Sequence, residues 1–170
     1  IMSMVPQDLG LEFLPFLNNP IVAVAPPDHP LCKLDHLRLQ DLEPHTLLVR
    51  EQGSGTRKAC EEYFKDKRVH FTQTLEVASA DAQRECVIAG LGIALLTRHA
   101  LNMELAAGVL KELPVEELPL YRSWCVVQAK AKRQSPVALA FLAFIRSERA
   151  LISGLVERFS ATPPAVPATP

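Results

Sequence analysis

The sequence predicts an α/β fold with a mostly parallel sheet. Short aliphatic and β-branched runs alternate with segments of helical periodicity along most of the chain. The connections between them contain turn-forming glycine, proline and serine. Of the 170 residues, 48% are hydrophobic and 22% are charged, which is a globular composition. Strands that alternate with helices at this spacing form βαβ units, in which neighbouring strands run parallel.

Each predicted strand is a short apolar or alternating run bounded by turn residues. The first run, NPIVAVA, stops at Pro26 and Pro27, because proline cannot donate a hydrogen bond to a sheet ladder. The predicted strands cover residues 19–25, 45–50, 71–77, 91–96, 109–113 and 120–128.

Each predicted helix carries a start or stop signal. Ser135 followed by Pro136 is a strong start, and Ser79 or Asp81 can cap a helix that Gly90 ends. The predicted helices cover residues 56–67, 80–90, 99–107 and 136 to about 159, with a short helix or turn over 37–42.

The order of these elements predicts two lobes. Residues 18–113 form a nearly complete small α/β unit, the second lobe, and residues 1–17 and 114–159 flank it as a partial first lobe. A chain that leaves one lobe, builds another and returns joins the two by crossing strands, and ligands bind in the cleft between them. Residues 160–170 are rich in proline, alanine and threonine, and we expect them to be disordered.

Charge and cysteine usage narrow the function classes. The net charge of −1 lacks the basic excess of a nucleic-acid-binding surface. The four cysteines are far apart and form no CxxC pair, so we expect free thiols in a reducing, cytoplasmic setting. No histidine pair has metal-ligand spacing, no signal peptide is visible, and no apolar run is long enough to cross a membrane. We therefore expect no metal and no cofactor.

The stretch REQGSGTR predicts an anion site at the start of a helix. A helix N-terminus offers unpaired N–H groups and a partial positive charge, and glycines let a ligand approach the backbone closely. This combination suits a carboxylate, a sulfate or a phosphate. An equally weighted interpretation is a turn in which a hydroxyl caps the helix. The candidate ligand-binding residues are Gln52, Gly53, Ser54, Gly55 and Thr56, with Arg50 and Arg57 as possible charge partners.

Other chemistries fit this stretch less well. It is neither a P-loop nor a GxSxG nucleophile elbow. An enzyme that used Ser54 or Thr56 would need a base, and no histidine is placed nearby. We therefore expect no catalytic residues. Ser3, just after an apparent strand end, can face the cleft, although an ordinary turn residue is the commoner case.

Three motifs in register carry a family resemblance. NPIVAVAPPDHPL, REQGSGTR and SADAQRECVIAGLGIALL followed by TRHAL occur in that order. Together they resemble the effector-binding domain of LysR-type transcriptional regulators, over roughly residues 1–145. The block at 87–96 matches the family pattern V.aGlGia.lP, with Thr97 in place of its proline. REQGSGTR is most similar to the CbbR-type regulators of carbon-fixation operons, with sulfur-assimilation regulators nearby.

The resemblance implies two Rossmann-like lobes, as in periplasmic-binding-protein-like domains of type 2. It implies that an N-terminal winged helix-turn-helix and the first half of the first lobe lie outside this chain. It also implies homodimers or homotetramers that bind promoter DNA through that missing domain. A small anionic metabolite would bind between the lobes, with a phosphorylated sugar, NADPH, sulfate or sulfite as candidates. The family's cleft contacts map to Gln52–Thr56 and to the crossover strands, near Ser3 and Ala25.

One other binding protein shares this architecture. A solute-binding protein of a transporter also has two lobes, but it is exported, and a signal peptide upstream of Ile1 would favour it. Four unpaired cysteines argue against it.

Overall fold

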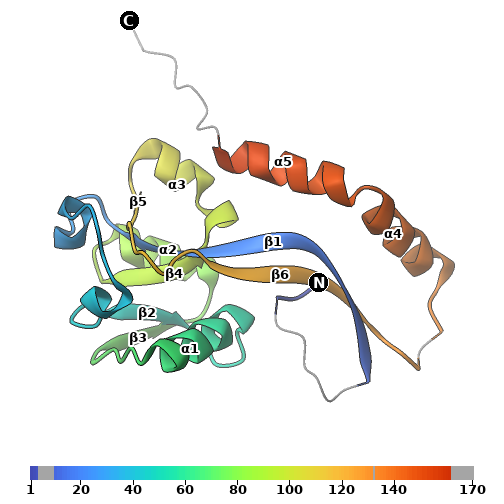
Figure 1. Ribbon diagram of the computed structural model, residues 1–170, viewed down its shortest axis with the longest axis horizontal. Helices are drawn as coiled ribbons and strands as arrows, with labels where there is room; N and C mark the ends of the chain where they lie inside the picture. Colours follow the sequence, from blue (N-terminus) through green and yellow to red (C-terminus); the bar gives the residue numbers. More distant parts are fainter. Residues whose placement is uncertain (4–9, 132, 162–170) are drawn as a thin grey trace, which may run out of the picture.

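The computed structural model describes residues 1–3, 10–131 and 133–161 (Figure 1). Its strands are β1 (Leu11–Ala25), β2 (Leu47–Arg50), β3 (Thr74–Val77), β4 (Ile93–Thr97), β5 (Lys111–Glu112) and β6 (Leu120–Ala129). Its α-helices are α1 (Gly55–Lys67), α2 (Ala80–Ile88), α3 (Asn102–Ala107), α4 (Pro136–Ser147) and α5 (Arg149–Ala161). Three short 3-10 helices, η1 to η3, cover Pro30–Lys33, Leu39–Leu42 and Arg98–Ala100.

The sheet mixes parallel and antiparallel strands, so the prediction of a mostly parallel sheet was wrong. The strand order is β3-β2-β4-β1-β5, and β6 also pairs with β1. β2 runs parallel to β3 and to β4, as the crossover helices α1 and α2 require. β1 runs antiparallel to β4, β5 and β6. Apolar periodicity finds a strand but carries no information about its direction, which here depends on partners far along the chain.

β1 and β6 form one long ribbon that links the two ends of the molecule (Figure 1). Their register runs from Leu11 opposite Ala129 to Ile21 opposite Leu120, with an irregularity between Pro15 and Leu17. β1 therefore begins well before the predicted start at residue 19 and crosses the expected lobe boundary at 17. Polar and proline residues in its middle hid that continuity in the sequence.

Helices cover both faces of the sheet beside this ribbon (Figure 1). On one face, α1 contributes Ala59, Cys60 and Phe64 to a core with alternate residues of β1. On the other face, α2 and α3 pack over a second core that contains Val87 and Leu101. Because successive side chains of a pleated strand point to opposite faces of the sheet, the residues of β1 alternate between these two cores.

The predicted helix 136–159 is two helices that meet at Glu148, whose backbone leaves the helical region at φ −99°. The predicted helix 99–107 likewise divides into η3 and α3. α5 extends to Ala161, so residues 160 and 161 are helical where we expected disorder; the rest of that predicted tail lies outside the described residues.

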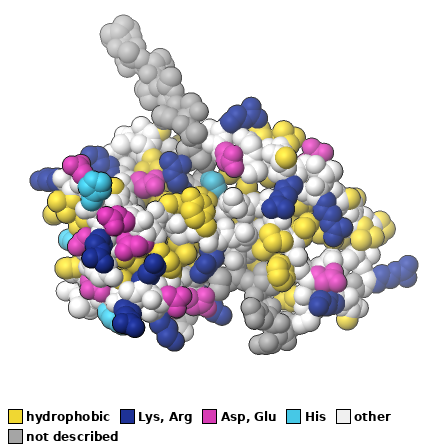
Figure 2. Space-filling model, in the orientation of Figure 1, with side chains coloured by type: hydrophobic (Ala, Val, Ile, Leu, Met, Phe, Trp, Pro, Cys, Tyr) yellow, Lys and Arg dark blue, Asp and Glu magenta, His cyan; other side chains and the backbone are white. Residues whose placement is uncertain are grey.

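The α4–α5 end has a sparse core. Its cluster holds the buried side chains Phe16, Leu17 and Ile145, against which a few half-buried residues pack. On α4, Val137 is 79% exposed and Phe144 is 55% exposed. Figure 2 shows hydrophobic side chains alternating with lysines and arginines over the part of this face where Figure 1 places α4 and α5. α4 and α5 thus leave several large apolar side chains exposed over a small core.

Candidate anion-binding site

Ser54 caps α1. Its backbone is extended, at φ −62° and ψ 126°, and its Oγ accepts a hydrogen bond from the Arg57 N–H at 3.4 Å. A turn precedes it, with Gly53 at φ +91° and the Ser54 N–H donating to the Glu51 carbonyl at 3.2 Å. The capping interpretation therefore holds for Ser54. One serine satisfies one orphan donor, so the N–H groups of Gly55 and Thr56 stay available to a ligand.

Gly55 and Thr56 line a cavity of about 810 Å³, which we call the loop cavity. All six predicted ligand-binding residues line it: Ser3, Gln52, Gly53, Ser54, Gly55 and Thr56. Ser3 reaches it because Met2 pairs with Cys125 of β6, with N–H···O distances of 3.0 and 2.9 Å. The structure brings these residues together, and their role in binding stays a prediction. Ala25, in contrast, is fully buried at the far end of β1, opposite Lys111, and does not line the loop cavity.

The two arginines of the motif already have carboxylate partners. Arg50 binds Glu51 through two hydrogen bonds of 2.7 Å, which hold the pKa of the Glu51 carboxyl below its usual range. Arg57 donates to Glu61 at 2.7 Å and to Glu76 at 2.6 Å, and these bonds raise the pKa of its guanidinium. Both arginines thus line the loop cavity with much of their charge compensated.

Lys58 is the more accessible cation. It is exposed, lines the loop cavity and forms no ion pair with another described residue. The first residues of α1 and Lys58 line the same cavity, and both the helix N-terminus and an ammonium group favour a bound negative charge. Glu61 also lines the cavity, where it is paired with Arg57 at 2.7 Å, and we expect the helix N-terminus and Lys58 to favour an anion there.

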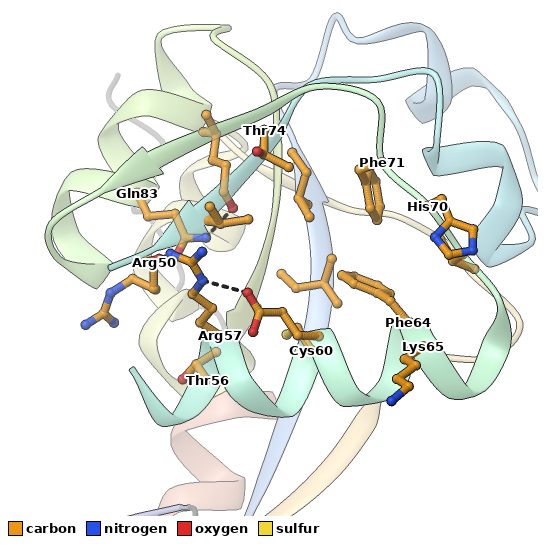
Figure 3. Close-up of a pocket in the computed structure, with 16 residues that line it drawn as sticks. Arg50, Thr56, Arg57, Cys60, Phe64, Lys65, His70, Phe71, Thr74 and Gln83 are labelled. Atoms are coloured by element: carbon orange, nitrogen blue, oxygen red, sulfur yellow. Dashed lines mark hydrogen bonds and ion pairs between the residues drawn. The ribbon is translucent and has the colours of Figure 1, made fainter. Parts of the chain in front are cut away.

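A second cavity of about 370 Å³ lies between α1, β2 and β3 (Figure 3). Phe64 and Phe71, with ring centroids 5.0 Å apart, line one end of it, and Arg50, Thr56 and Arg57 line the other. Cys60 also lines it, but burial raises the pKa of that thiol to about 12. Cys60 is therefore a protonated, unreactive thiol at neutral pH.

A third cavity of about 280 Å³, the side cavity, adjoins the same helix start. Arg50 and Thr56 line both it and the loop cavity, so the two spaces meet at these residues. Its other walls include Gln83 of α2, Thr97 at the end of β4, and Trp124 of β6. Our sequence interpretation missed all three. Gln83 was detectable, because it lies four residues before Val87 on the buried stripe of α2, where an apolar residue is expected.

No group of three or more histidine, cysteine or acidic residues is placed to hold a metal ion in the described part of the chain. All four cysteines are free thiols. Across the described ranges, no helix is both long enough and apolar enough to cross a membrane.

Comparison with known proteins agrees with this arrangement. The model of the LysR substrate binding domain matches residues 1–150. The chain is 36% identical over 150 residues to a RuBisCO operon transcriptional regulator of Allochromatium vinosum, covering 88% of this chain and 50% of the regulator. It is 38% identical over 140 residues to the transcriptional activator CmpR of Synechocystis, covering 82% of this chain and 46% of CmpR. This chain thus spans about half the length of these relatives, which are transcriptional regulators.

Solved structures show the same fold. The regulatory domain of CcmR from Synechocystis PCC6803, in complex with 2-PG, aligns with a TM-score of 0.79 at 33% identity, covering 86% of this chain and 70% of that domain. The effector binding domain of QuiR, in complex with shikimate, aligns with a TM-score of 0.78 at 24% identity, covering 89% and 71%. These are regulatory domains of the periplasmic-binding-protein-like α/β fold that we expected. The motifs, the topology and the match over residues 1–150 show that this chain belongs to the family of LysR substrate-binding domains.

Proposed function

We propose that this chain is the effector-sensing part of a LysR-type transcriptional regulator and binds a small anionic metabolite at the start of α1. One observation carries the proposal. The Ser54 cap leaves the N–H groups of Gly55 and Thr56 without an intrahelical partner, and both residues line a cavity of about 810 Å³ together with the rest of the predicted loop and Ser3. The helix dipole and Lys58 favour an anion in that space. The chain acts as a sensor and not as an enzyme.

The relatives narrow the class of effector. Two of them are RuBisCO operon transcriptional regulators, and the CcmR domain was solved with 2-PG. We therefore rank phosphorylated metabolites, including sugar bisphosphates, above sulfate and sulfite, and NADPH stays a candidate.

The wider organisation follows the family. We propose that residues 18–113 form the second lobe, and that residues 1–17 and 114–159 belong to a first lobe completed by further chain of the kind that the relatives carry. The sparse core beside α4 supports this, since its exposed apolar side chains need a cover. An attached helix-turn-helix would bind promoter DNA in the bacterial cytoplasm, as a homodimer or homotetramer. Effector binding would change that DNA binding.

Thermal unfolding with a panel of anions tests the proposal. The panel contains ribulose bisphosphate, NADPH, 2-PG, sulfate and sulfite. An anion at about 100 times its dissociation constant stabilises the native state by about 2.7 kcal/mol, which raises the unfolding temperature by several degrees. A folded protein whose unfolding temperature is unchanged by every anion would contradict the proposal.

Two lysines of α1 supply a matched pair of variants. Lys58→Gln removes the exposed cation at the loop cavity and should weaken anion binding by about 3- to 10-fold, with a larger effect at low salt. Lys67→Gln makes the same charge change at the other end of the helix, beside Tyr63, and should leave binding unchanged. Equal losses in both variants would show that the anion responds to overall charge and not to this site.

A further inference from the structure

The cavity between α1, β2 and β3, which we call the edge cavity, has a mostly apolar lining (Figure 3). The apolar residues come from β2, from α1 and from the connection between α1 and β3, and they include Leu47, Val49, Phe64, Val69 and Phe71. Leu47, Phe64 and Val69 are buried, whereas Val49 and Phe71 are partly exposed. The edge cavity therefore reaches from the surface to the core beneath α1.

The edge of the sheet explains why this space exists. β3 is an edge strand, in which Thr74 and Glu76 pair in register with Leu47 and Val49 of β2. Paired residues of neighbouring strands point to the same face, so the apolar residues of β2 border polar, exposed side chains on β3. In the described part of the chain, the core that α1 shares with β2 takes no side chain from β3. The apolar face of α1 thus ends over β2, and a space remains beside β3.

Ion pairs compensate the charges at the polar end of the edge cavity. Arg57 lines this end and donates to Glu61 at 2.7 Å and to Glu76 at 2.6 Å. Arg50, also at this end, is held by its neighbouring carboxylate at 2.7 Å. Lys65 lines the cavity as well, but it is exposed, and an exposed ion pair contributes little. A charged ligand thus gains little here, and the apolar walls favour an uncharged one.

The size and the walls of the edge cavity indicate an aromatic ligand. The cavity measures about 370 Å³, whereas a dry apolar cavity of roughly 150 Å³ holds one benzene molecule. Phe64 and Phe71 line one end, with ring centroids 5.0 Å apart. Aromatic rings attract one another at centroid distances of roughly 4.5–7 Å, so these two side chains favour a third ring beside them. The space accommodates one ring or two fused rings.

We propose that the edge cavity is a second ligand site, which takes an uncharged aromatic molecule of one or two fused rings and packs it against Phe64 and Phe71. Thr56 and Arg57 line both this cavity and the loop cavity, but the two sites differ in chemistry. The start of α1 then carries an anion on one side and an apolar ring on the other. The inference does not depend on the proposed function.

Calorimetric titration with indole tests this inference in wild type, Thr74→Phe and Leu75→Phe. Thr74 lines the edge cavity from an exposed position, so a phenylalanine there occupies the space without removing core packing. Thr74→Phe should weaken indole binding at least about 10-fold, because the ring can no longer be buried. Leu75, the next residue of β3, points to the opposite face of the sheet and does not line the cavity. Leu75→Phe should therefore bind indole as wild type does.

Two further measurements keep the test decisive. Phe71→Leu keeps an apolar side chain but removes one ring, and should weaken indole binding by about 2- to 10-fold even if Thr74→Phe fails to fold. Indole-3-acetate carries the same ring system with a carboxylate, and should bind more weakly than indole.

A folded wild type that does not bind indole would overturn the site, and so would equal affinities of all the folded variants. Tighter binding of indole-3-acetate than of indole, lost in Thr74→Phe, would overturn the requirement for an uncharged ligand. Because the anion panel can shift the unfolding temperature in either case, this inference and the proposed function can fail separately.

Discussion

Replacing Gly55 with proline should weaken anion binding strongly without disturbing α1. Gly55 is the first residue of α1, directly after the capping Ser54. Proline is favoured at this position, because its fixed φ suits the helix and the lost N–H has no intrahelical partner. The residue before a proline must be extended, and Ser54, at ψ 126°, already is. The helix should therefore form as before.

The size of the effect follows from the bond that is lost. A hydrogen bond from a backbone N–H to a charged ligand is worth about 1.5–3 kcal/mol, which corresponds to about 10- to 150-fold in affinity. Gly55→Ala is the matched control, because it keeps the N–H and adds one methyl group. Both substitutions restrict the unfolded chain, an effect that by itself favours the folded state by about 0.4–1 kcal/mol.

Denaturant unfolding measures the stability of the three proteins, and calorimetric titration measures their affinity for the tightest anion of the panel. The expected order of affinity is wild type, then Gly55→Ala close behind, then Gly55→Pro far below. If Gly55→Pro binds as tightly as Gly55→Ala, the N–H at the start of α1 does not contact the ligand, and the loop cavity needs another explanation.

Three further predictions concern the scaffold. Gly92→Ala should lower the free energy of unfolding by at least about 2 kcal/mol, because its Cβ would overlap the Thr46 carbonyl oxygen that accepts the Ile93 N–H at 2.9 Å. In contrast, Gly154→Ala meets no atom within 4 Å in α5 and should raise that free energy by about 0.4–1 kcal/mol in the same denaturant titration. The pKa of Cys60 is raised from 9.0 to about 12, so its thiol favours the folded state below pH 9 and loses this contribution as the pH rises toward 12. Between pH 7 and pH 10, wild type should therefore lose roughly 1 kcal/mol more than Cys60→Ala, and equal losses would contradict the raised pKa.

Much of the fold was predictable because the local signals were unambiguous. Ser79 and Ser135 cap their helices as expected, accepting hydrogen bonds from Ala82 and Ala138. The direction and length of β1 were not predictable. Residues 11–18 mix apolar and polar types, and their strand is stabilised by a partner more than a hundred residues away in β6. The local sequence pattern contains no information about pairing between strands that are so far apart in the chain.

Some features of the candidate site were also predictable from the sequence, and others were not. Its loop was predictable, because glycines and hydroxyls before an amphipathic helix have a physical meaning wherever they occur. The state of its arginines was not, since Arg57 meets Glu76 from a neighbouring strand. Nor was the place of Trp124, which β6 carries to the helix start from the other end of the chain. Side chains that converge from distant segments can be found only once the topology is known.

The position of β1 in the sheet also affects the nascent chain during synthesis. β1 is synthesised before all of its partners, since β4, β5 and β6 lie between Ile93 and Ala129. At roughly 5–20 residues per second, the ribosome needs several seconds to supply the first of them. During that time Phe16, Ile21 and Val22, all buried in the finished protein, have no sheet to join. The nascent chain is therefore most prone to aggregation before β4 emerges, and protein truncated ahead of β6 would keep half of β1 as an unpaired edge.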